Sequence, residues 1–204
     1  MEELHLIAGL GNPGREYART RHNAGFRVVE RLACRWRAAW ASEKKFHARL
    51  AWADPAGRRV LLAMPQSYMN ASGEAVGALL AFYRVLLSRL LVVTDDADLP
   101  LGRLRLKPGG GTAGHHGLES IQQHVGSPDY ARQRLGIGRR AGAREITGHV
   151  LGRFDSTELA LVDKVVDVAC DQVECWLRAG AQTAMNQFNG VIVNLDPGSE
   201  RTDQ

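Results

Sequence analysis

The feature that most constrains the fold is a regular alternation of strand-like and helix-like segments along the chain. Runs of strand length, apolar or alternating between apolar and polar residues, occur at 4–8, 46–52, 59–63, 90–94, 103–107 and 132–138. Apolar residues at helical spacing occupy the intervals 24–40, 72–87 and 118–125 and the stretch after residue 155. This order is typical of an α/β domain, and we expect a twisted, mixed and mostly parallel sheet flanked by helices.

Length and composition agree with one folded domain. The chain has 204 residues, enough for a sizeable core but no more than a single domain usually holds. We expect residues 1–195 to form one α/β domain and residues 196–204 to form a mobile polar tail. No run approaches the ~18 apolar residues of a membrane helix and no basic leader opens the chain, which predicts a cytoplasmic protein without membrane contact. The three cysteines are odd in number and lie in apolar helical stretches, which favours inert thiols over disulfides.

The last helix has recognisable ends. The segment Asp155-Ser156-Thr157-Glu158 fits a capping box, in which the first and last side chains satisfy each other's backbone N–H groups. An apolar stripe follows, and Gly180 is predicted to end the helix.

A glycine-rich segment follows the first predicted strand. Gly9-Leu10-Gly11-Asn12-Pro13-Gly14 matches the dinucleotide-binding pattern G-x-G-x-x-G. In that pattern a helix begins inside the motif and its free N–H groups hold a pyrophosphate, whereas Pro13 has no N–H and helical spacing resumes only at Ala24. We therefore interpret the segment as a rigid turn that presents Asn12, with a purely structural turn as the alternative.

His22 is a candidate general base, because it lies in a polar segment at the start of the helix predicted for 24–40. An imidazole in such a setting can stay accessible and accept a proton at neutral pH. Three carboxylates follow the predicted strand 90–94: Asp95, Asp96 and Asp98. A carboxylate that accepts the ring N–H fixes the tautomer and makes the other nitrogen a better base. The alternatives are a surface or capping histidine, and a solvated turn or hard-cation site for the acids.

Basic side chains alternate along the strand predicted for 103–107, which places Arg103, Arg105 and Lys107 on one face. Arg132 and Arg134 repeat the pattern in the next predicted strand. Two such strands can hold a phosphate, and they concentrate the modest net charge of +4 in one place. The alternative is a solvated strand face.

Four spaced motifs together resemble the bacterial-type peptidyl-tRNA hydrolase family from Leu6 to about Asn189. The first is the Gly9–Gly14 segment with Tyr17 and the run Thr20-Arg21-His22-Asn23-Ala24-Gly25. The others are Pro65-Gln66-Ser67-Tyr68-Met69-Asn70 with Ser72-Gly73, then Asp95-Asp96-Ala97-Asp98-Leu99-Pro100 with Gly102, and the loop Gly109–Gly111 that leads into Thr112–His116.

The resemblance implies an esterase-type hydrolase of this fold that uses water and needs no metal and no organic cofactor. His22 would accept the proton and Asp95 would support it. Substrate-binding roles would fall to Asn12, Tyr17, Asn23, Tyr68, Met69, Asn70, His115 and His116. Arg105, Lys107 and Arg134 would grip the tRNA 5′ phosphate. The partner would be peptidyl-tRNA, bound at its acceptor stem and CCA end by a monomer whose catalytic domain spans residues 1–195.

The chain departs from the family pattern at three positions. His116 stands where the family commonly has asparagine, and an imidazole lacks the fixed donor and acceptor pair of an amide. Thr94 replaces a frequent histidine, and Asp96 replaces a glutamate. Two rival functions follow from the same residues, a non-enzymatic RNA-binding protein and a hydrolase of another ester or a small nucleotide.

Overall fold

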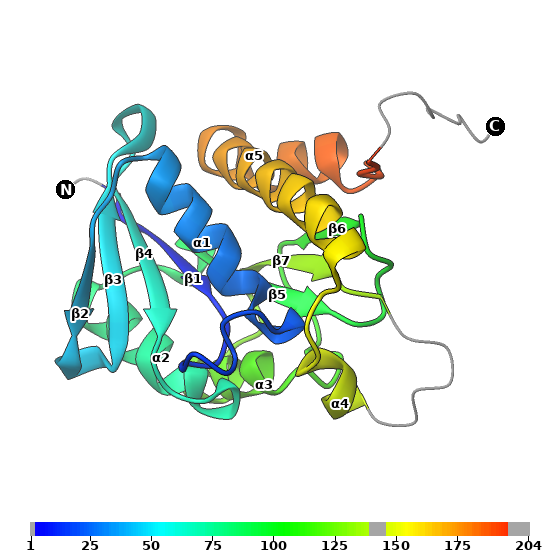
Figure 1. The fold of residues 1–204 in the computed structure, drawn as a ribbon. Helices are drawn as coiled ribbons and strands as arrows, with labels where there is room; N and C mark the ends of the chain where they lie inside the picture. Colours follow the sequence, from blue (N-terminus) through cyan, green and yellow to red (C-terminus); the bar gives the residue numbers. More distant parts are fainter. Residues whose placement is uncertain (1–2, 139–145, 196–204) are drawn as a thin grey trace.

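The computed structural model describes residues 3–138 and 146–195, which form a sheet with helices on both faces (Figure 1). The strands are β1 (His5–Gly9), β2 (Trp40–Glu43), β3 (Ala48–Ala53), β4 (Val60–Pro65), β5 (Leu90–Asp96), β6 (Leu104–Lys107) and β7 (Ala131–Gly136). The helices are α1 (Ala24–Arg35), α2 (Ser72–Tyr83), α3 (His116–Val125), α4 (Ile146–Val150) and α5 (Ser156–Phe188). None of these helices combines the length and the hydropathy of a membrane-spanning segment. The tail predicted for 196–204 lies outside the described residues.

The sheet is mixed, as expected, and its strand order is β2-β3-β4-β1-β5-β7-β6. The four central strands β4, β1, β5 and β7 run parallel, whereas β2, β3 and β6 add antiparallel edges. Three of the six pairings in the described sheet are therefore parallel, so a mostly parallel arrangement holds only for its centre. Parallel strands with their carboxyl ends at one edge are where open α/β sheets place ligand sites.

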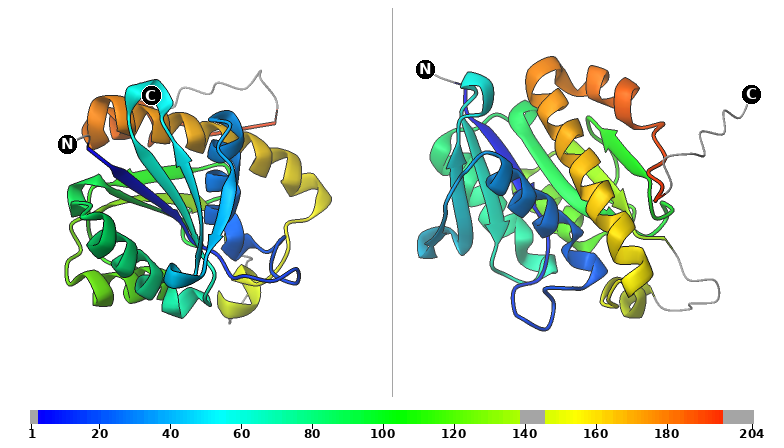
Figure 2. Two further views of the ribbon diagram at one scale, coloured as in Figure 1. Left: turned by 90° about the vertical axis from the view of Figure 1, so that its left-hand side faces the viewer. Right: turned by 45° about the horizontal axis from the view of Figure 1, so that its top comes forward.

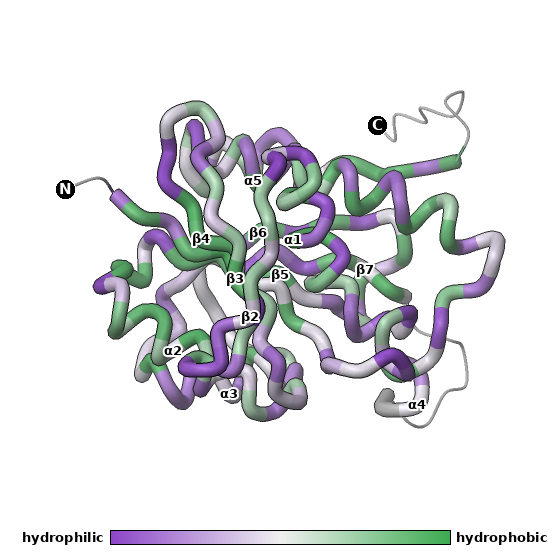
Figure 3. Tube along the Cα trace, turned by 60° about the vertical axis from the view of Figure 1, so that its left-hand side comes forward, coloured by the Kyte–Doolittle hydropathy of each residue, from purple (hydrophilic) through white to green (hydrophobic). Residues whose placement is uncertain are grey.

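The sheet is buried on both faces because successive side chains of its central strands point to opposite sides. In β1, Leu6 packs in the layer of α2 and α3, whereas Ile7 packs in the layer of α1 and α5. Figure 2 shows the two helical layers on either side of the sheet, and Figure 3 shows hydrophobic segments gathered around β4 and β5 in the middle of the molecule. Continuous apolar strands such as 90–94 are the expected result of burial on both faces.

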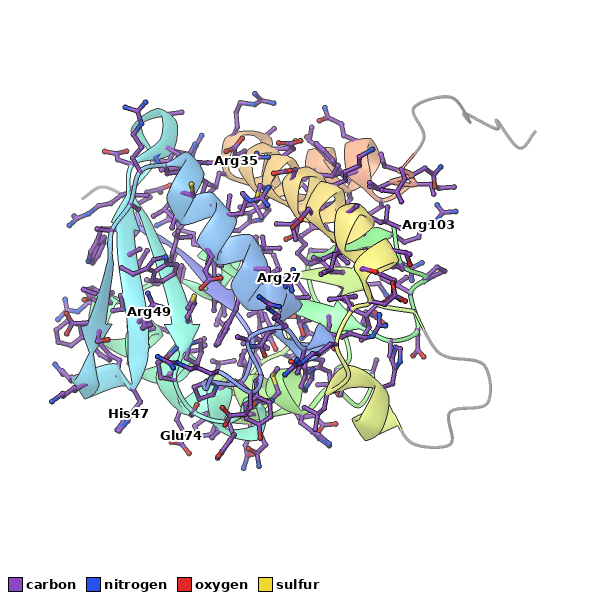
Figure 4. All side chains as sticks on the ribbon, viewed as in Figure 1. Arg27, Arg35, His47, Arg49, Glu74 and Arg103 are labelled. Atoms are coloured by element: carbon purple, nitrogen blue, oxygen red, sulfur yellow. The ribbon has the colours of Figure 1, made fainter. Side chains whose placement is uncertain are left out.

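Helices α1 and α5 lie side by side on one face and are joined by ion pairs as well as by apolar contacts (Figure 4). Arg31 pairs with Asp167, and Arg35 lies 2.6 Å from Asp171. These side chains are a quarter to a half exposed, so each pair adds little to stability.

Two helices end earlier than the sequence predicted, and one of them is the helix predicted for 72–87, since α2 ends at Tyr83. The helix predicted for 24–40 ends at Arg35, because Arg37 adopts a left-handed conformation (φ 54°) and Trp40 begins β2. Asp155 does cap α5 through the predicted box with Glu158. Gly180 is not helical (φ 82°, ψ 172°), so the helix that begins at Ser156 ends there as predicted, and a second helical segment, included in α5, continues to Phe188.

A close approach between α1 and the sheet determines where the site forms. A Cβ on Gly25 would lie 2.3 Å from the carbonyl oxygen of Val93 and 2.4 Å from the amide of Leu10, so only glycine fits. The backbone of Leu10 bonds to Val93 and Phe26 in the same region. The first turn of α1 and the short 3₁₀ turn before it, Arg21–Asn23, are thereby held against the carboxyl ends of β1 and β5.

Candidate active site

A cavity of about 430 Å³ opens at the carboxyl ends of the central strands. It is walled by the loop after β1, the turn after β4, the end of β5, the loop before α3 and the end of α4. Most residues predicted for the site line it: Asn12, His22, Tyr68, Met69, Asn70, Asp95, His115, His116 and Arg134.

His22 and Asp95 meet on the wall of this cavity, although 73 positions separate them in the chain. His22 Nδ1 lies 2.9 Å and 3.0 Å from the two carboxylate oxygens. Burial alone would raise the pKa of Asp95, but hydrogen bonds from His115 and His22 hold that pKa well below its usual range. The carboxylate is therefore charged and must accept the Nδ1–H of His22, which leaves Nε2 with a free lone pair. An imidazole in this tautomer can accept a proton from water.

His115 has its tautomer set by the helix that it caps. Its Nδ1 accepts hydrogen bonds from the backbone N–H groups of Gly117 (3.1 Å) and Leu118 (3.3 Å) at the start of α3. The proton of the neutral ring is therefore on Nε2. This nitrogen lies 2.6 Å from Thr94 Oγ1 and 3.1 Å from Asp95 Oδ1. The Nε2–H of His115 is therefore a hydrogen-bond donor toward Thr94 and Asp95.

His22, Asp95 and His115 are also the one group in the described residues with metal-ligand side chains close enough to share an ion. A cation on His115 would need the lone pair of Nε2, and the proton would then move to Nδ1. The two backbone N–H groups at the start of α3 would lose their acceptor. The donor chemistry therefore suits a chain of hydrogen bonds better than a metal ion.

Asn12 is held by its neighbours in one orientation. Its backbone exchanges two hydrogen bonds with the side chain of Asn23, at 2.8 Å and 3.0 Å. Its own Oδ1 accepts from the backbone N–H of Met69 at 2.8 Å. These contacts use the acceptor of the Asn12 amide and leave its NH₂ group as a donor for a ligand. As the sequence suggested, the glycine-rich segment is a rigid turn, and α1 begins only at Ala24.

Two residues expected to bind substrate, Tyr17 and Asn23, are not among those that line the cavity. Asn23 is buried and bonds to Asn12, as described above. Tyr17 packs its ring edge-on against Tyr68, with 6.4 Å between centroids, and Tyr68 is 63% exposed. Neither Asn23 nor Tyr17 lines the cavity, so in this structure both support residues that do.

The basic face predicted on two strands forms at the β6–β7 edge. Arg105 pairs in register with Arg134, and Lys107 pairs with Arg132, which places all four on one face because cross-strand partners share a side. Arg103 precedes β6 and bonds instead to the backbone of Gly190, so it does not join this face.

The arginines of β7 already have partners. Arg134 lies 3.2 Å from Asp96 and donates to the carbonyl of Gly111 at 2.8 Å. Arg132 is fully buried and holds the carbonyls of Gly110, Gly111 and Pro128. The two guanidinium groups thus fasten the glycine-rich loop that leads to His115, while Arg105 and Lys107 remain exposed.

Comparison with known proteins identifies the family. The model of the peptidyl-tRNA hydrolase family matches residues 6–196. The chain belongs to this family. It is 48% identical over 186 residues to the peptidyl-tRNA hydrolase of Synechococcus sp. (strain JA-2-3B'a(2-13)), which covers 91% of this chain and 83% of that protein. It is 49% identical over 186 residues to that of Anaeromyxobacter sp. (strain K), covering 91% and 96%.

Solved structures of peptidyl-tRNA hydrolases share the fold. The crystal structure of the Acinetobacter baumannii enzyme superposes with a TM-score of 0.88 at 40% sequence identity, covering 94% of this chain and 97% of that one. The predicted family and fold class are therefore confirmed, and the family is one of hydrolases.

The structure shows the position of His116, which stands where the peptidyl-tRNA hydrolase family commonly has asparagine. Its side chain is 73% exposed and lies 3.1 Å from Glu119 one turn along α3. It is at the rim of the cavity and makes no contact with His22 or Asp95 among the described residues.

Leu118, Val150 and Leu151 line the cavity although the sequence did not assign them to it, and Thr94 is distinguished in the sequence only as a departure from the family pattern. Val150 and Leu151, at the end of α4, add an apolar wall. Helix α4 has five residues, too few to show helical spacing. Thr94 had a visible signal, a polar residue at the end of a buried strand directly before Asp95, but its partner His115 is 21 positions away and could not be read from the sequence.

Proposed function

We propose that the chain hydrolyses the ester bond between a peptide, or an N-acylated amino acid, and the 3′ end of tRNA. The observation that carries this proposal is the pairing of His22 Nδ1 with the buried Asp95 carboxylate, at 2.9 Å and 3.0 Å, on the wall of the cavity. Membership of the peptidyl-tRNA hydrolase family supports the choice of substrate.

In the proposed reaction His22 Nε2 takes a proton from a water molecule as the water oxygen attacks the ester carbonyl. The charged Asp95 stabilises the imidazolium that forms. The carbon–oxygen bond to the ribose then breaks, and the imidazolium returns its proton to the departing 3′ oxygen. An ester is more reactive than an amide, so an activated water and a few hydrogen-bond donors suffice without a covalent nucleophile.

The amides around the cavity are proposed to select the acylated end. Asn12 offers its NH₂ group to the peptide, since its oxygen is held by Met69. Asn70, on the turn after β4, lines the same cavity and would hold the peptide and the terminal adenosine together with Tyr68. Tyr68 is exposed enough to contact a base or a ribose. Tyr17 and Asn23 would act by keeping Tyr68 and Asn12 in place.

The exposed cations of β6 are proposed to bind the tRNA backbone. Arg105 and Lys107 share a face with Arg134, which also lines the cavity, so a bound acceptor stem would extend from the cavity along this edge. We further propose that the protein acts in the cytoplasm as a monomer, because a single chain supplies both the cavity and the basic face.

The decisive experiment is single-turnover hydrolysis of an N-acetylaminoacyl-tRNA by the wild-type chain, His22→Ala and Asp95→Asn. We expect a loss of at least about 100-fold for the histidine variant, since general bases contribute about 10²–10⁴ in rate. Circular dichroism and thermal melting establish that each variant is folded. A parallel assay with EDTA is expected to leave the wild-type rate unchanged.

Three outcomes would reject the proposal or part of it. Full activity of folded His22→Ala would remove the histidine from the reaction. Inactivity of the wild-type chain combined with tight tRNA binding would favour a non-enzymatic RNA-binding protein. Competition of tRNA by free nucleotides at similar concentration would favour a hydrolase of small nucleotides.

A further inference from the structure

Thr94 has no assigned part in the chemistry, yet it contacts the centre of the site. It is fully buried at the end of β5, beside Asp95 in the chain. Its hydroxyl oxygen lies 2.6 Å from His115 Nε2 and 3.5 Å from Asp95 Oδ1. A threonine in this position offers one acceptor and one donor to two charged or polar neighbours.

The direction of the hydrogen bond between Thr94 and His115 follows from the helix cap. Because Nδ1 of His115 accepts from Gly117 and Leu118, its Nε2 carries the only ring proton. That proton has two acceptors in reach, Thr94 Oγ1 at 2.6 Å and Asp95 Oδ1 at 3.1 Å. The shorter contact is with the hydroxyl, so Thr94 takes the larger share of the His115 proton.

The consequence falls on Asp95 and, through it, on His22. A carboxylate that receives a full hydrogen bond from His115 has less negative charge to offer the imidazole on its other side. We propose that Thr94 is a positioning residue for the general base: by accepting the His115 proton it keeps the Asp95 carboxylate available to His22. This inference rests on the function proposed above and deepens it. It names the residue that accepts a hydrogen bond from His115 and so leaves the Asp95 carboxylate available to His22.

Other charges face His22 and must be counted. Asp95 reaches it from β5, and His115 from the start of α3 lies with its ring 5.1 Å away. Asp96, Asp98, His116 and Arg134 also line the cavity, and Asp96 and Arg134 pair with each other. Arg21, its neighbour on the 3₁₀ turn, is paired with Glu158. A change at Thr94 alters none of these charges, so a shift in the behaviour of His22 cannot arise from a gained or lost charge.

The test compares Thr94→Val with Thr94→Ser. Valine keeps the shape of threonine and removes the hydroxyl, whereas serine keeps the hydroxyl. We expect the valine variant to lose about three- to tenfold in kcat/KM at neutral pH and the acid limb of its pH–rate profile to move down by roughly half a pH unit. The serine variant is expected to retain most of the wild-type rate and the wild-type profile.

Two NMR measurements make the test independent of activity. Nitrogen chemical shifts of wild-type His115 are expected to show the tautomer with the proton on Nε2. The titration midpoint of His22, followed by its Cε1 proton, is expected to move to lower pH in Thr94→Val and to stay in Thr94→Ser. These readouts remain valid even if the chain hydrolyses no peptidyl-tRNA, so a failure of the proposed function is distinguishable from a failure of this inference.

Several results would overturn the inference. A proton on Nδ1 of wild-type His115 would end it without any variant. A valine variant that melts at a lower temperature but keeps the wild-type pH profile and His22 titration would give Thr94 a structural role only. A shift of the His22 midpoint to higher pH would mean that the hydroxyl acts mainly as a donor to Asp95. If the valine variant does not fold, the tautomer of wild-type His115 still tests the inference, because a proton on Nδ1 would overturn it.

Discussion

Arg134 and Asp96 form an ion pair across the adjacent parallel strands β7 and β5, with 3.2 Å between Nη1 and Oδ2. Both side chains are nearly buried, and the same guanidinium also holds the carbonyl of Gly111. A cation proposed to bind a tRNA phosphate is therefore already neutralised by a neighbour. Any phosphate that Arg134 binds must compete with Asp96.

Asp96→Asn is expected to strengthen tRNA binding. The asparagine leaves the Arg134 charge without its counter-ion, so an incoming phosphate meets a stronger attraction. We expect the Kd for deacylated tRNA to fall several-fold at low salt, measured by fluorescence anisotropy. Asp54→Asn is the matched control, because it removes the same charge in the exposed turn before β4, away from the cavity. An equal gain in affinity for both variants would show that only net charge matters.

Lys107→Gln is expected to weaken tRNA binding and to make it less sensitive to salt. Each lost phosphate contact reduces the slope of log K against log salt concentration by about one. Arg58→Gln is the control, because Arg58 is exposed and lies just before the amino end of β4, whereas the cavity lies at the carboxyl end of that strand. Titrations at several ionic strengths check the slope. Parallel lines for wild-type protein and Lys107→Gln would remove this lysine from the interface.

Asp95 is expected to stabilise the fold above about pH 4. Hydrogen bonds from His115 and His22 hold its pKa below the value of about 3.9 in the unfolded chain. A group with a depressed folded pKa contributes stability that is present above the unfolded value and is lost as pH falls below it. Asp95→Asn should therefore unfold at lower urea concentration than wild type at pH 7, and the difference should narrow below pH 4. A gap that stays constant with pH would contradict the charged state assigned to this acid.

The order of strands and helices is predictable because each central strand is apolar over its length and each main helix has an apolar stripe. The point at which α1 ends cannot be predicted from the sequence. Trp36 and Trp40 continue the helical spacing, but the backbone of Ala38 bonds to Ala33 while Arg37 takes the left-handed conformation that glycine usually supplies at a helix end. With arginine there, the sequence carries no stop signal. Strand β2 is short and mostly exposed, so it lacks the alternation that reveals a half-buried strand.

The site, like the fold, can be predicted from the sequence only in part. His22 and Asp95 can be chosen from motifs and chemistry, and the register of β1 on β5 explains why their loops meet. The contact of Thr94 with His115 depends instead on how α3 is placed over the end of β5. The spacing of residues in the sequence does not predict where α3 lies relative to β5.

The thiols are expected to differ sharply in reactivity. Cys34 is exposed on α1, whereas Cys170 and Cys175 are buried in α5. Burial raises the pKa of Cys170 to about 12, more than the nearby Arg35 lowers it, so this thiol stays protonated in the native protein. At pH 8 an aromatic disulfide reagent should titrate one thiol quickly and the other two only after unfolding. Cys34→Ser should abolish the fast phase, and a persistent fast phase would place a second thiol at the surface.

Gly25→Ala is expected to damage both the fold and the site. The added methyl would lie 2.3 Å from the carbonyl oxygen of Val93, a backbone atom that cannot swing away. Relieving the overlap must lift the start of α1 from β5, at a cost of about 3 kcal/mol or more in the free energy of unfolding. Gly190→Ala is the control, because nothing lies within 4 Å of its added methyl and its φ is not positive, so a change within about 0.5 kcal/mol is expected.

The same displacement would carry His22 with it, since the 3₁₀ turn that holds this residue leads directly into α1. His22 Nδ1 lies 2.9 Å and 3.0 Å from the two Asp95 oxygens, and a shift of about 1 Å away from the carboxylate is enough to lengthen both distances beyond hydrogen-bond range. The activity of folded Gly25→Ala should therefore fall further than its stability, measured as turnover well below its melting temperature. Turnover equal to wild type in this variant would show that α1 can move without moving the base, and the close approach would then serve stability alone.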